Sequence, residues 1–193
     1  MSVIPWQFNS DGLLDPGTYE ATFTQVEASI LVQGDDSSKF WDVQWRKELL
    51  LRARVLTEQM WSVGIEDIYL DGSFVEDKDH PNDIDGYFDP HLSMYSKDDM
   101  EKFEKIVSNL NSLDLHKVWD WDHRSRRPYK GYSKGQLPMW HFYRVEFYPH
   151  LGQGTQVTDK HGNDLQFPSA FRQSRTGFKQ KGILKIIREA KND

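Results

Sequence analysis

Residues 67–90 read DIYLDGSFVEDKDHPNDIDGYFDP, and the fold expected for this chain rests on them. The first part, Asp67-Ile68-Tyr69-Leu70, reads as a strand that ends at the turn Asp71-Gly72-Ser73. Nine residues later, Asp83-Ile84-Asp85-Gly86-Tyr87-Phe88 reads as a second strand, which Asp89-Pro90 ends. The stretch predicts two neighbouring strands with acidic residues and a glycine turn at their ends.

Two carboxylates of the second strand are expected to act together. Asp83 and Asp85 are two positions apart, so on a strand they share one face while Ile84 points into the core. Two carboxylates this close repel each other unless a cation neutralises them, and such oxygen ligands suit Mg²⁺. At the turn, Gly72 lets the backbone approach a ligand, and the backbone N–H groups with the Ser73 hydroxyl can hold a phosphate. A phosphate cradle beside divalent metal ions is the equipment for nucleotidyl transfer.

The pattern of an apolar residue, Gly-Ser, a gap of about ten residues and Asp-apolar-Asp resembles the signature of the polymerase β-like nucleotidyltransferase superfamily. That superfamily includes poly(A) and CCA-adding enzymes, antibiotic nucleotidyltransferases and the minimal nucleotidyltransferases of toxin–antitoxin systems. The resemblance covers residues 66–88 and, more loosely, the preceding helix and the strand near residue 146. It implies Mg²⁺ or Mn²⁺ at the site, a nucleoside triphosphate such as ATP as substrate, and a third carboxylate on a later strand.

Glu146 is the candidate for this third carboxylate. It is the only acidic residue between Asp122 and Asp159, and its strand is otherwise mostly apolar and aromatic. A lone carboxylate in such a strand is costly unless it is paired, so we expect a metal ion or a cation partner. The alternative to a metal ion is a salt bridge with Arg144, two positions away and expected on the same face, or with another cation.

The residues after Ser73 depart from the minimal nucleotidyltransferases, which continue with a small, a basic and a glycine residue at the start of a helix. Here Phe74-Val75-Glu76-Asp77-Lys78 follows, and we interpret Lys78 as a substitute phosphate-binding cation. The start around Asp15-Pro16-Gly17, and the ending that contains Phe167-Pro168 and Lys181-Gly182-Ile183, are similar to bacterial nucleotidyltransferase-like proteins. Some of those proteins are linked to toxin–antitoxin or phage-defence loci.

The flanking segments place these strands in an α/β or α+β fold, a small mixed sheet flanked by helices. Helices are expected at 18–31, 39–62 and 97–110 and a further strand at 140–148, while 183–187 suits either a strand or a helix. Ser37 or Ser38 is the expected N-cap of the helix at 39–62, and Gly64 its C-terminal cap. Arg46 is expected away from the apolar face of that helix.

The length of 193 residues suits a single nucleotidyltransferase-like domain with three parts. These are a helical arm at 1–64, a catalytic core at 65–150 and a basic extension at 151–193. The chain has no cysteine, which excludes disulfides, cysteine-ligated zinc and thiol nucleophiles. It shows no signal-peptide pattern and no run of about 18 apolar residues, so we expect no membrane association and a cytoplasmic protein.

Charge is divided unevenly along the chain. Residues 1–122 hold 25 acidic and 10 basic residues, whereas residues 123–193 hold 5 acidic and 14 basic residues. Two interpretations stay open: the basic part binds a polyanion, or the two parts attract each other within one globule. A zone near the C-terminus shares this basic character and contains Arg172, Arg175, Lys179, Lys181, Lys185 and Arg188.

The loop at 123–134 mixes cations with tyrosines. Such a mixture suits single-stranded nucleic acid, and it suits a triphosphate, a protein partner or a plain solvated loop equally well. Candidate acceptor-binding residues in this loop are Arg124, Arg126, Arg127, Tyr129 and Lys130.

The expected function is transfer of a nucleoside monophosphate from a triphosphate to an acceptor hydroxyl, with an RNA or tRNA end placed ahead of other acceptors. The expected catalytic and metal-binding residues are Asp83, Asp85 and Glu146, with Gly72, Ser73 and Lys78 as phosphate-binding residues. Two alternatives stay open. One is an enzyme that nucleotidylates a protein, and the other is a non-catalytic antitoxin or partner-binding module with the nucleotidyltransferase fold.

Overall fold

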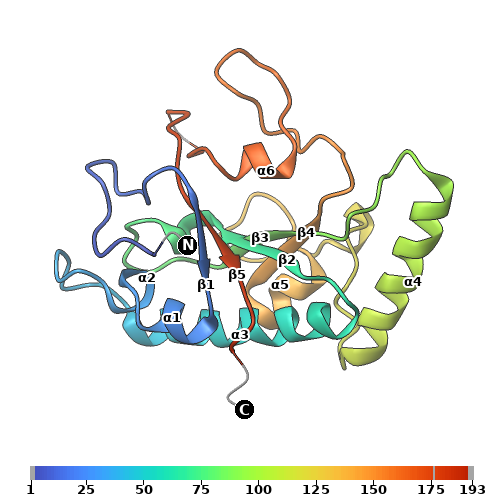
Figure 1. Cartoon of the computed structure of the whole chain (residues 1–193), viewed down its shortest axis with the longest axis horizontal. Coiled ribbons are helices and arrows are strands. Elements are labelled where there is room, and N and C mark those ends of the chain that lie inside the picture. Colours follow the sequence, from blue (N-terminus) through green and yellow to red (C-terminus); the bar gives the residue numbers. More distant parts are fainter. Residues whose placement is uncertain (1–2, 176, 191–193) are drawn as a thin grey trace.

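A five-stranded mixed sheet forms the centre of the computed structural model, which describes residues 3–175 and 177–190 (Figure 1). The strands are Thr18–Ala21 (β1), Asp67–Asp71 (β2), Ile84–Asp89 (β3), Val145–Pro149 (β4) and Ile183–Ile186 (β5). They lie in the order β1-β5-β2-β3-β4. Helices flank this sheet, which confirms the expected α/β class.

Helices cover one side of the sheet, and mostly loops cover the other. The helices are Phe23–Glu27 (α1), Ile30–Gln33 (α2), Val43–Ser62 (α3), Lys97–Leu113 (α4), Pro138–Tyr143 (α5) and Phe167–Ala170 (α6), with 3₁₀ turns at Gly72–Val75 (η1) and His123–Ser125 (η2). Figure 1 shows α3 running along one side of the sheet, with α6 and the C-terminal loops on the opposite side. Leu49 and Leu56 of α3 pack in one core with Leu70 and Ile84 of the sheet. Because side chains alternate along a strand, the neighbours of those core residues face the loop-covered side.

The start of α3 differs from the expected one. Asp42 is the N-cap, and its side chain accepts a hydrogen bond from the backbone N–H of Trp45 at 2.9 Å. Ser37 and Ser38 lie in the preceding loop, so the expected serine cap was wrong. Gly64 follows the helix with φ of 87°, a conformation that favours glycine and fits the expected C-terminal cap.

Residues 18–31 were expected as one helix, and this expectation was wrong. They begin as strand β1, in which the buried Tyr19 and Ala21 alternate with less buried residues. The strand pairs in parallel with β5, Thr18 standing opposite Ile183. The helical part starts only at α1, which Thr22 caps. Pairing between the two ends of the chain stabilises this strand, and a local sequence pattern cannot report that.

The segment 140–148 was expected to be one strand, but its first part is the helix α5. Pro138 occupies the first turn of α5, where a residue without an N–H fits well. Arg144 then adopts a left-handed conformation with φ of 55°, and β4 begins at Val145. Strand β4 pairs in parallel with β3.

The two ends of the chain belong to the sheet itself. Strand β1 comes from the expected helical arm at 1–64, and β5 from the expected basic extension at 151–193, whose residues 191–193 lie outside the described part. The segment 183–187, left open between strand and helix, is a strand over Ile183–Ile186. None of the helices in the described residues is long and apolar enough to span a membrane.

Candidate metal and phosphate site

Three carboxylates form one row across neighbouring strands, on the side of the sheet opposite α3. Asp71 of β2 stands opposite Asp85 of β3, and Asp85 stands opposite Glu146 of β4. Residues in such register have Cβ atoms about 4.5–5.5 Å apart, so the three acids share one space. Asp71 and Glu146 are buried. The sequence predicted Asp85 and Glu146 as neighbours but assigned no role to Asp71.

An aromatic row lies next to the carboxylates. Tyr69, Tyr87 and Tyr148 stand opposite one another in the same three strands. Tyr69 and Tyr87 stack with ring centroids 4.5 Å apart, and Phe167 of α6 stacks on Tyr148 at 5.3 Å. These rings close one side of the carboxylate row with apolar surface.

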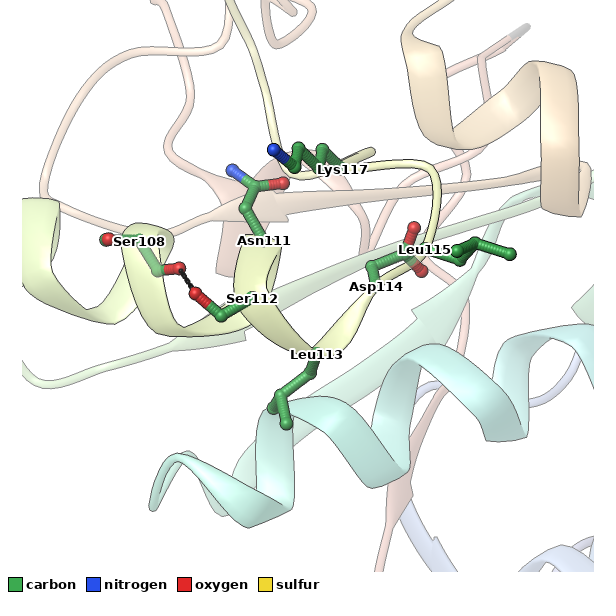
Figure 2. Close-up of a pocket in the computed structure, with 7 residues that line it drawn as sticks. All are labelled: Ser108, Asn111, Ser112, Leu113, Asp114, Leu115 and Lys117. Carbon is green, nitrogen blue, oxygen red and sulfur yellow. Dashed lines mark hydrogen bonds between the residues drawn. The ribbon is translucent and has the colours of Figure 1, made fainter.

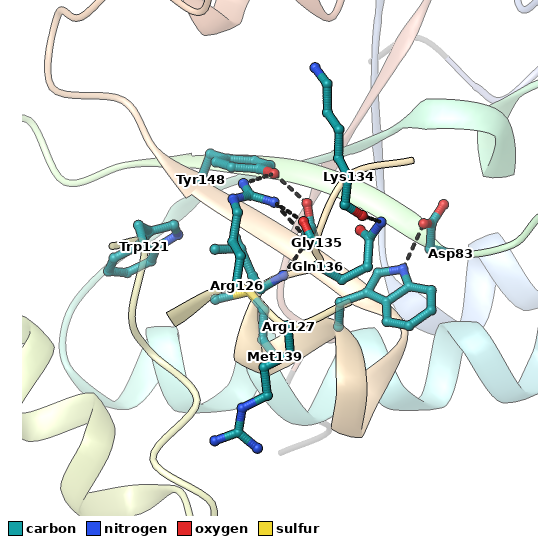
Figure 3. Close-up of polar contacts among 12 residues, drawn as sticks. Asp83, Trp121, Arg126, Arg127, Lys134, Gly135, Gln136, Met139 and Tyr148 are labelled. Carbon is teal, nitrogen blue, oxygen red and sulfur yellow. Dashed lines mark hydrogen bonds and ion pairs between the residues drawn. The ribbon is translucent and has the colours of Figure 1, made fainter. Parts of the chain in front are cut away.

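Asp85 lies in a cluster of like charges. Its side chain is 14% exposed. Burial raises the pKa of Asp85, and the Asp83 and Glu146 carboxylates raise this pKa further, while Arg175 lowers it. Asp83 precedes β3, and its Oδ2 accepts a hydrogen bond from the indole N–H of Trp140 at 2.8 Å (Figure 3). The structure therefore brings the three predicted carboxylates into one electrostatic cluster.

Gly72 lies directly against Asp85. It begins the turn η1 with φ of 73°, and a Cβ added to it would lie 2.5 Å from Oδ2 of Asp85. A side chain at this position would therefore meet both a strained backbone and a collision with the carboxylate. Ser73 follows as the second residue of η1 and is partly exposed. The predicted Gly-Ser turn thus adjoins the predicted carboxylates.

Asp71 and Lys181 form a buried ion pair that the sequence did not reveal. Lys181 is 3% exposed, and its Nζ lies 3.1 Å from Oδ1 of Asp71 and 2.5 Å from Oε1 of Glu76. The same Nζ lies 3.4 Å from the backbone oxygen of Gly72. Burial raises the pKa of Asp71, and the Lys181 ammonium opposes this shift. In the sequence Lys181 is one cation of a basic zone, and no pattern distinguishes it from the others.

Glu146 has hydrogen-bond donors on both of its oxygens. Oε1 accepts from the backbone N–H of Leu137 at 2.9 Å, and Oε2 accepts from the hydroxyl of Tyr148. The guanidinium of Arg126 lies 3.7 Å from Oε1, and it also donates to the Tyr148 hydroxyl at 3.2 Å (Figure 3). The cation partner of Glu146 is therefore Arg126.

Arg144, the partner considered from the sequence, lies elsewhere. Its guanidinium carbon is 3.9 Å from the ring centroid of Trp140 and 4.4 Å from that of Tyr129. The expectation that Arg144 shares a strand face with Glu146 was wrong, because the strand begins only after Arg144.

The donor set partly fits a divalent metal ion. Carboxylates are the ligands that Mg²⁺ and Mn²⁺ prefer, and Asp83 and Asp85 offer such oxygens beside the Gly-Ser turn. Within residues 3–175 and 177–190, however, no group of three or more His, Asp or Glu side chains is placed to hold one ion. Of the three predicted ligands, Asp83 and Asp85 would be the ones to hold an ion. Glu146, whose oxygens accept from Leu137 and Tyr148, would have to shift to join them.

Arg46 holds the segment that follows Ser73 from the helix side. It is fully buried, so the expectation that it lies away from the apolar face of its helix was wrong. Its guanidinium donates to four backbone oxygens, those of Leu31 (2.6 Å), Phe74 (2.8 Å), Glu76 (3.1 Å) and Lys78 (2.5 Å). Lys78 itself is exposed, and in the described part of the chain no contact joins its ammonium to the turn. The cation placed beside Gly72 is Lys181.

The loop between Arg126 and Leu137 lies beside Asp83. Two backbone hydrogen bonds of 2.9 Å join Arg127 and Gln136 and close this loop. Within it, burial raises the pKa of Tyr132, and the Asp83 carboxylate raises it further. Tyr132 and Asp83 both contact Trp140. The Tyr132 ring packs edge-on against that of Trp140, with centroids 5.0 Å apart.

The candidate acceptor-binding residues have unequal surroundings. Arg124 pairs with Asp122, and this pairing holds the pKa of Asp122 well below its usual range. Arg126 is engaged with the Glu146 group described above. Arg127, Tyr129 and Lys130 are exposed, and in the described residues neither Arg127 nor Lys130 has an acidic partner. Figure 3 shows Arg127 and Lys134 extending in opposite directions from the loop.

A separate surface depression lies at the end of α4 (Figure 2). Its lining residues are Ser108, Asn111, Ser112, Leu113, Asp114, Leu115 and Lys117. None of them belongs to the carboxylate row or to the Gly-Ser turn, and the depression offers no group suited to nucleotidyl transfer.

The comparisons with known proteins gave one match. Residues 6–187 match a family described as "Family of unknown function (DUF6932)". No curated protein and no solved structure matches the chain.

Proposed function

The chain belongs to the DUF6932 family, and we propose that it is a metal-dependent nucleotidyltransferase that moves a nucleoside monophosphate from a triphosphate to an acceptor hydroxyl. One observation carries this proposal: Asp85 stands opposite Glu146 in the sheet and in contact with Gly72 of the Gly-Ser turn. Residues that lie far apart in the sequence thus meet in the arrangement that the polymerase β-like resemblance implies. The pairing of Asp85 with Glu146 in the sheet supports the proposal more strongly than the sequence motif alone. A motif that arose by chance would not be expected to lie beside a third carboxylate.

The roles of the acids follow from their positions. Asp83 and Asp85 would hold the divalent metal ions, Mg²⁺ or Mn²⁺, which neutralise phosphate charge and polarise the α-phosphate. Glu146 would complete the metal site from β4 after release from Tyr148. The Leu137 N–H and Arg126 would then remain as the groups that orient it.

The Gly-Ser turn would hold the β- and γ-phosphates. Gly72 lies against Asp85, Ser73 follows it in the same turn, and Lys181 contacts the backbone oxygen of Gly72 from within the protein. Lys78 was interpreted from the sequence as a phosphate-binding cation. It is exposed on the protein surface, so it would bind the phosphates only if its side chain reaches them from there. Lys181 contributes positive potential at the turn without leaving its two acidic partners.

The reaction would be an in-line displacement at the α-phosphorus. An acceptor hydroxyl oxygen forms the new P–O bond, the bond to the β-phosphate oxygen breaks, and pyrophosphate leaves. The proton of the acceptor hydroxyl passes to a carboxylate of the row, with Glu146 as the assigned group. Stacked tyrosine and phenylalanine rings on one side limit the access of water to the reacting atoms.

The acceptor would be an RNA end, with tRNA as the leading case. Tyr132 lies near Asp83, and Tyr129 and Lys130 are exposed on the same loop, so an unpaired base could stack there while its sugar hydroxyl reaches the metal site. The toxin–antitoxin or phage-defence setting stays a prediction from the resemblance, as does a protein acceptor.

Binding and transfer assays test the proposal. Wild-type protein is titrated with each nucleoside triphosphate with and without Mg²⁺, and then incubated with each labelled triphosphate and total cellular RNA. We expect Mg²⁺-dependent binding and a labelled RNA product, both lost in Asp85→Asn. A protein that binds no triphosphate at millimolar Mg²⁺ would contradict the proposal.

One observation favours the rival function, a non-catalytic partner-binding module with this fold. Each carboxylate of the row already has a cation from the protein: Lys181 for Asp71, Arg175 for Asp85 and Arg126 for Glu146. A site neutralised in this way can persist without metal. The same titration separates the two functions, because a partner-binding module shows no metal-dependent affinity for triphosphate.

A further inference from the structure

Arg175 stands apart from the other two cations of the carboxylate row. Its Nη2 lies 3.4 Å from Oδ2 of Asp85, yet its side chain is 89% exposed. Lys181, by contrast, is buried between two acids at shorter distances. A guanidinium this exposed, 3.4 Å from the carboxylate, forms a weak ion pair that exchanges readily. Lys181 is therefore a fixed counter-ion, whereas Arg175 is a displaceable one.

The backbone that leads into Arg175 is anchored. Gln173 and Ser174, which precede it, are buried, and the N–H of Ser174 donates to the Lys179 oxygen at 2.8 Å. Gln173 bridges Gln180 in antiparallel fashion, and the ammonium of Lys179 pairs with Asp11. The side chain of Arg175 is thus exposed to solvent and reaches the carboxylate of Asp85, a predicted metal ligand.

We propose that Arg175 is a triphosphate-binding residue whose guanidinium moves from Asp85 to the phosphates when the nucleotide is loaded. This inference rests on the proposed function and deepens it, because it assigns a substrate contact to the C-terminal zone. In the metal-free protein the guanidinium neutralises Asp85. With divalent ions held at Asp85, Arg175 would lose this partner beside the turn that is proposed to hold the β- and γ-phosphates.

Guanidinium chemistry suits this exchange. Its planar set of N–H donors binds phosphate oxygens in pairs, and such charge-assisted bonds are stronger than a long contact to one carboxylate oxygen. The exchange requires rotation of an exposed side chain, and the preceding backbone at Gln173 and Ser174 is already buried and hydrogen-bonded. Arg175 therefore has two opposite effects: it competes with the metal for Asp85 and it attracts the triphosphate.

These opposite signs give the test. Binding of Mn²⁺ alone and of a non-hydrolysable triphosphate analogue at saturating Mg²⁺ is measured for the wild-type protein, Arg175→Ala and Arg175→Lys. We expect Arg175→Ala to bind Mn²⁺ about two- to fivefold more tightly, because a competing cation is gone. We expect the same variant to bind the analogue about tenfold more weakly, because a charge-assisted contact is lost. Arg175→Lys keeps the positive charge but lacks the planar set of N–H donors. Its affinities for Mn²⁺ and for the analogue should therefore lie between those of the wild type and Arg175→Ala.

Arg188→Ala is the matched control. It removes an exposed cation of the same basic zone that pairs with Glu66, away from the carboxylate row, and it should leave both affinities unchanged. If the wild-type protein binds the analogue and Arg175→Ala binds it equally well, the inference is wrong while the proposed function stands. If Arg175→Ala weakens both ligands together, Arg175 supports the local fold and the inference is again overturned. If the wild-type protein binds no analogue, the proposed function fails, and this inference fails with it.

Discussion

At Gly72, a single residue links the turn to the carboxylates. The substitution Gly72→Ala destabilises the fold in two ways. It places an alanine at a positive φ of 73°, and it brings a Cβ to within 2.5 Å of the Asp85 carboxylate. Gly64→Ala is a control with one of these costs, since Gly64 also has a positive φ, of 87°, but has nothing within 4 Å of the added Cβ. We expect Gly64→Ala to lower the free energy of unfolding by about 1 kcal/mol and Gly72→Ala by a further ~1–3 kcal/mol.

Urea denaturation of both variants measures that difference. Equal losses would mean that Asp85 moves aside without cost, and Gly72 would then be required for its backbone conformation alone.

Asp83 and Asp85 share a predicted role but differ in what they do for the fold. Asp85→Asn removes one of several crowded like charges, so the melting temperature in metal-free buffer should hold or rise. Asp83→Ala removes the acceptor of the buried Trp140 indole N–H, which should cost about 1–3 kcal/mol. Both variants should lose nucleotidyl transfer, so thermal melting and transfer assays on the same preparations separate the structural role from the chemical one.

A large loss of stability in Asp85→Asn would instead make that carboxylate a structural group. Asp83→Asn serves as the milder comparison, because its amide oxygen can still accept from Trp140.

At the scale of the elements, Asp114 joins the ends of three helices. Its carboxylate accepts hydrogen bonds from Gln59 of α3 at 2.9 Å, from the Tyr143 hydroxyl of α5 at 2.7 Å and from the N–H of His116 beyond α4 at 2.8 Å. Burial alone would raise the pKa of Asp114, but these hydrogen bonds lower it overall. A carboxyl group with a lowered pKa in the folded state stabilises the protein above its unfolded pKa, and this contribution disappears as the pH falls through the folded value.

Asp114→Asn should therefore destabilise the protein at pH 7 and lose less additional stability below about pH 4 than the wild type. Urea midpoints at several values between pH 2.5 and 7, about the range over which carboxyl groups titrate, measure this. Glu104→Gln, an exposed change on α4, is the control. Parallel acid profiles for Asp114→Asn and the wild type would show that the hydrogen bonds do not stabilise the ionised form.

Local sequence patterns were sufficient for some elements and insufficient for others. Strands β2 and β3 and helices α3 and α4 lie where apolar spacing and turn residues predict them, because each has a complete local signal. Strand β1 was missed because its stabilising partner is at the other end of the chain. Helix α5 was missed because its short run of aromatic residues fits a strand as well as a helix, and only the context of Pro138 and Arg144 distinguishes them.

The site divides in the same way. Gly72 follows β2, Asp83 precedes β3 and Asp85 lies in β3, and these two strands pair, so a local motif can identify the three residues. Lys181, Arg175 and Arg46 reach the turn or the acids from distant segments of the chain. The sequence does not distinguish a buried arginine or lysine from an exposed one. The sequence therefore predicts the acids more readily than the cations that neutralise them.

At the scale of the whole molecule, ion pairs between the two parts of the chain compensate part of the uneven charge. Three lysines of the basic C-terminal zone form ion pairs with acids of the N-terminal part: Lys179 with Asp11, Lys181 with Asp71 and Lys185 with Asp67. Of the two interpretations left open by the sequence, attraction between the two parts of the chain is thus supported by named ion pairs. Among the described residues, Arg127, Lys130 and Lys134 of the loop between Arg126 and Leu137 are exposed and have no acidic partner, so they remain available to a polyanion.

The last prediction concerns this remaining basic surface. Lys130 and Lys134 are exposed in the loop that carries Tyr132 next to Asp83, and in the described residues neither pairs with an acid. Each lysine that contacts a phosphate of single-stranded RNA contributes about 0.7 to the slope of log affinity against log salt concentration. If RNA is the acceptor, the double variant Lys130→Ala/Lys134→Ala should therefore flatten this slope by about 1.4 and weaken binding most at low salt.

Arg124→Ala is the matched control, because Asp122 already neutralises Arg124 within the protein. Its salt slope should remain close to that of the wild type, although Arg124 lies in the same basic segment. Arg126 is unsuitable for this purpose, since its removal also disturbs Glu146. RNA binding is measured by fluorescence anisotropy with a labelled single-stranded 3′ end over a range of salt concentrations. If the wild type does not bind at low salt, or if the double variant and Arg124→Ala change the slope equally, the loop does not receive RNA, and a protein or small-molecule acceptor becomes the leading assignment.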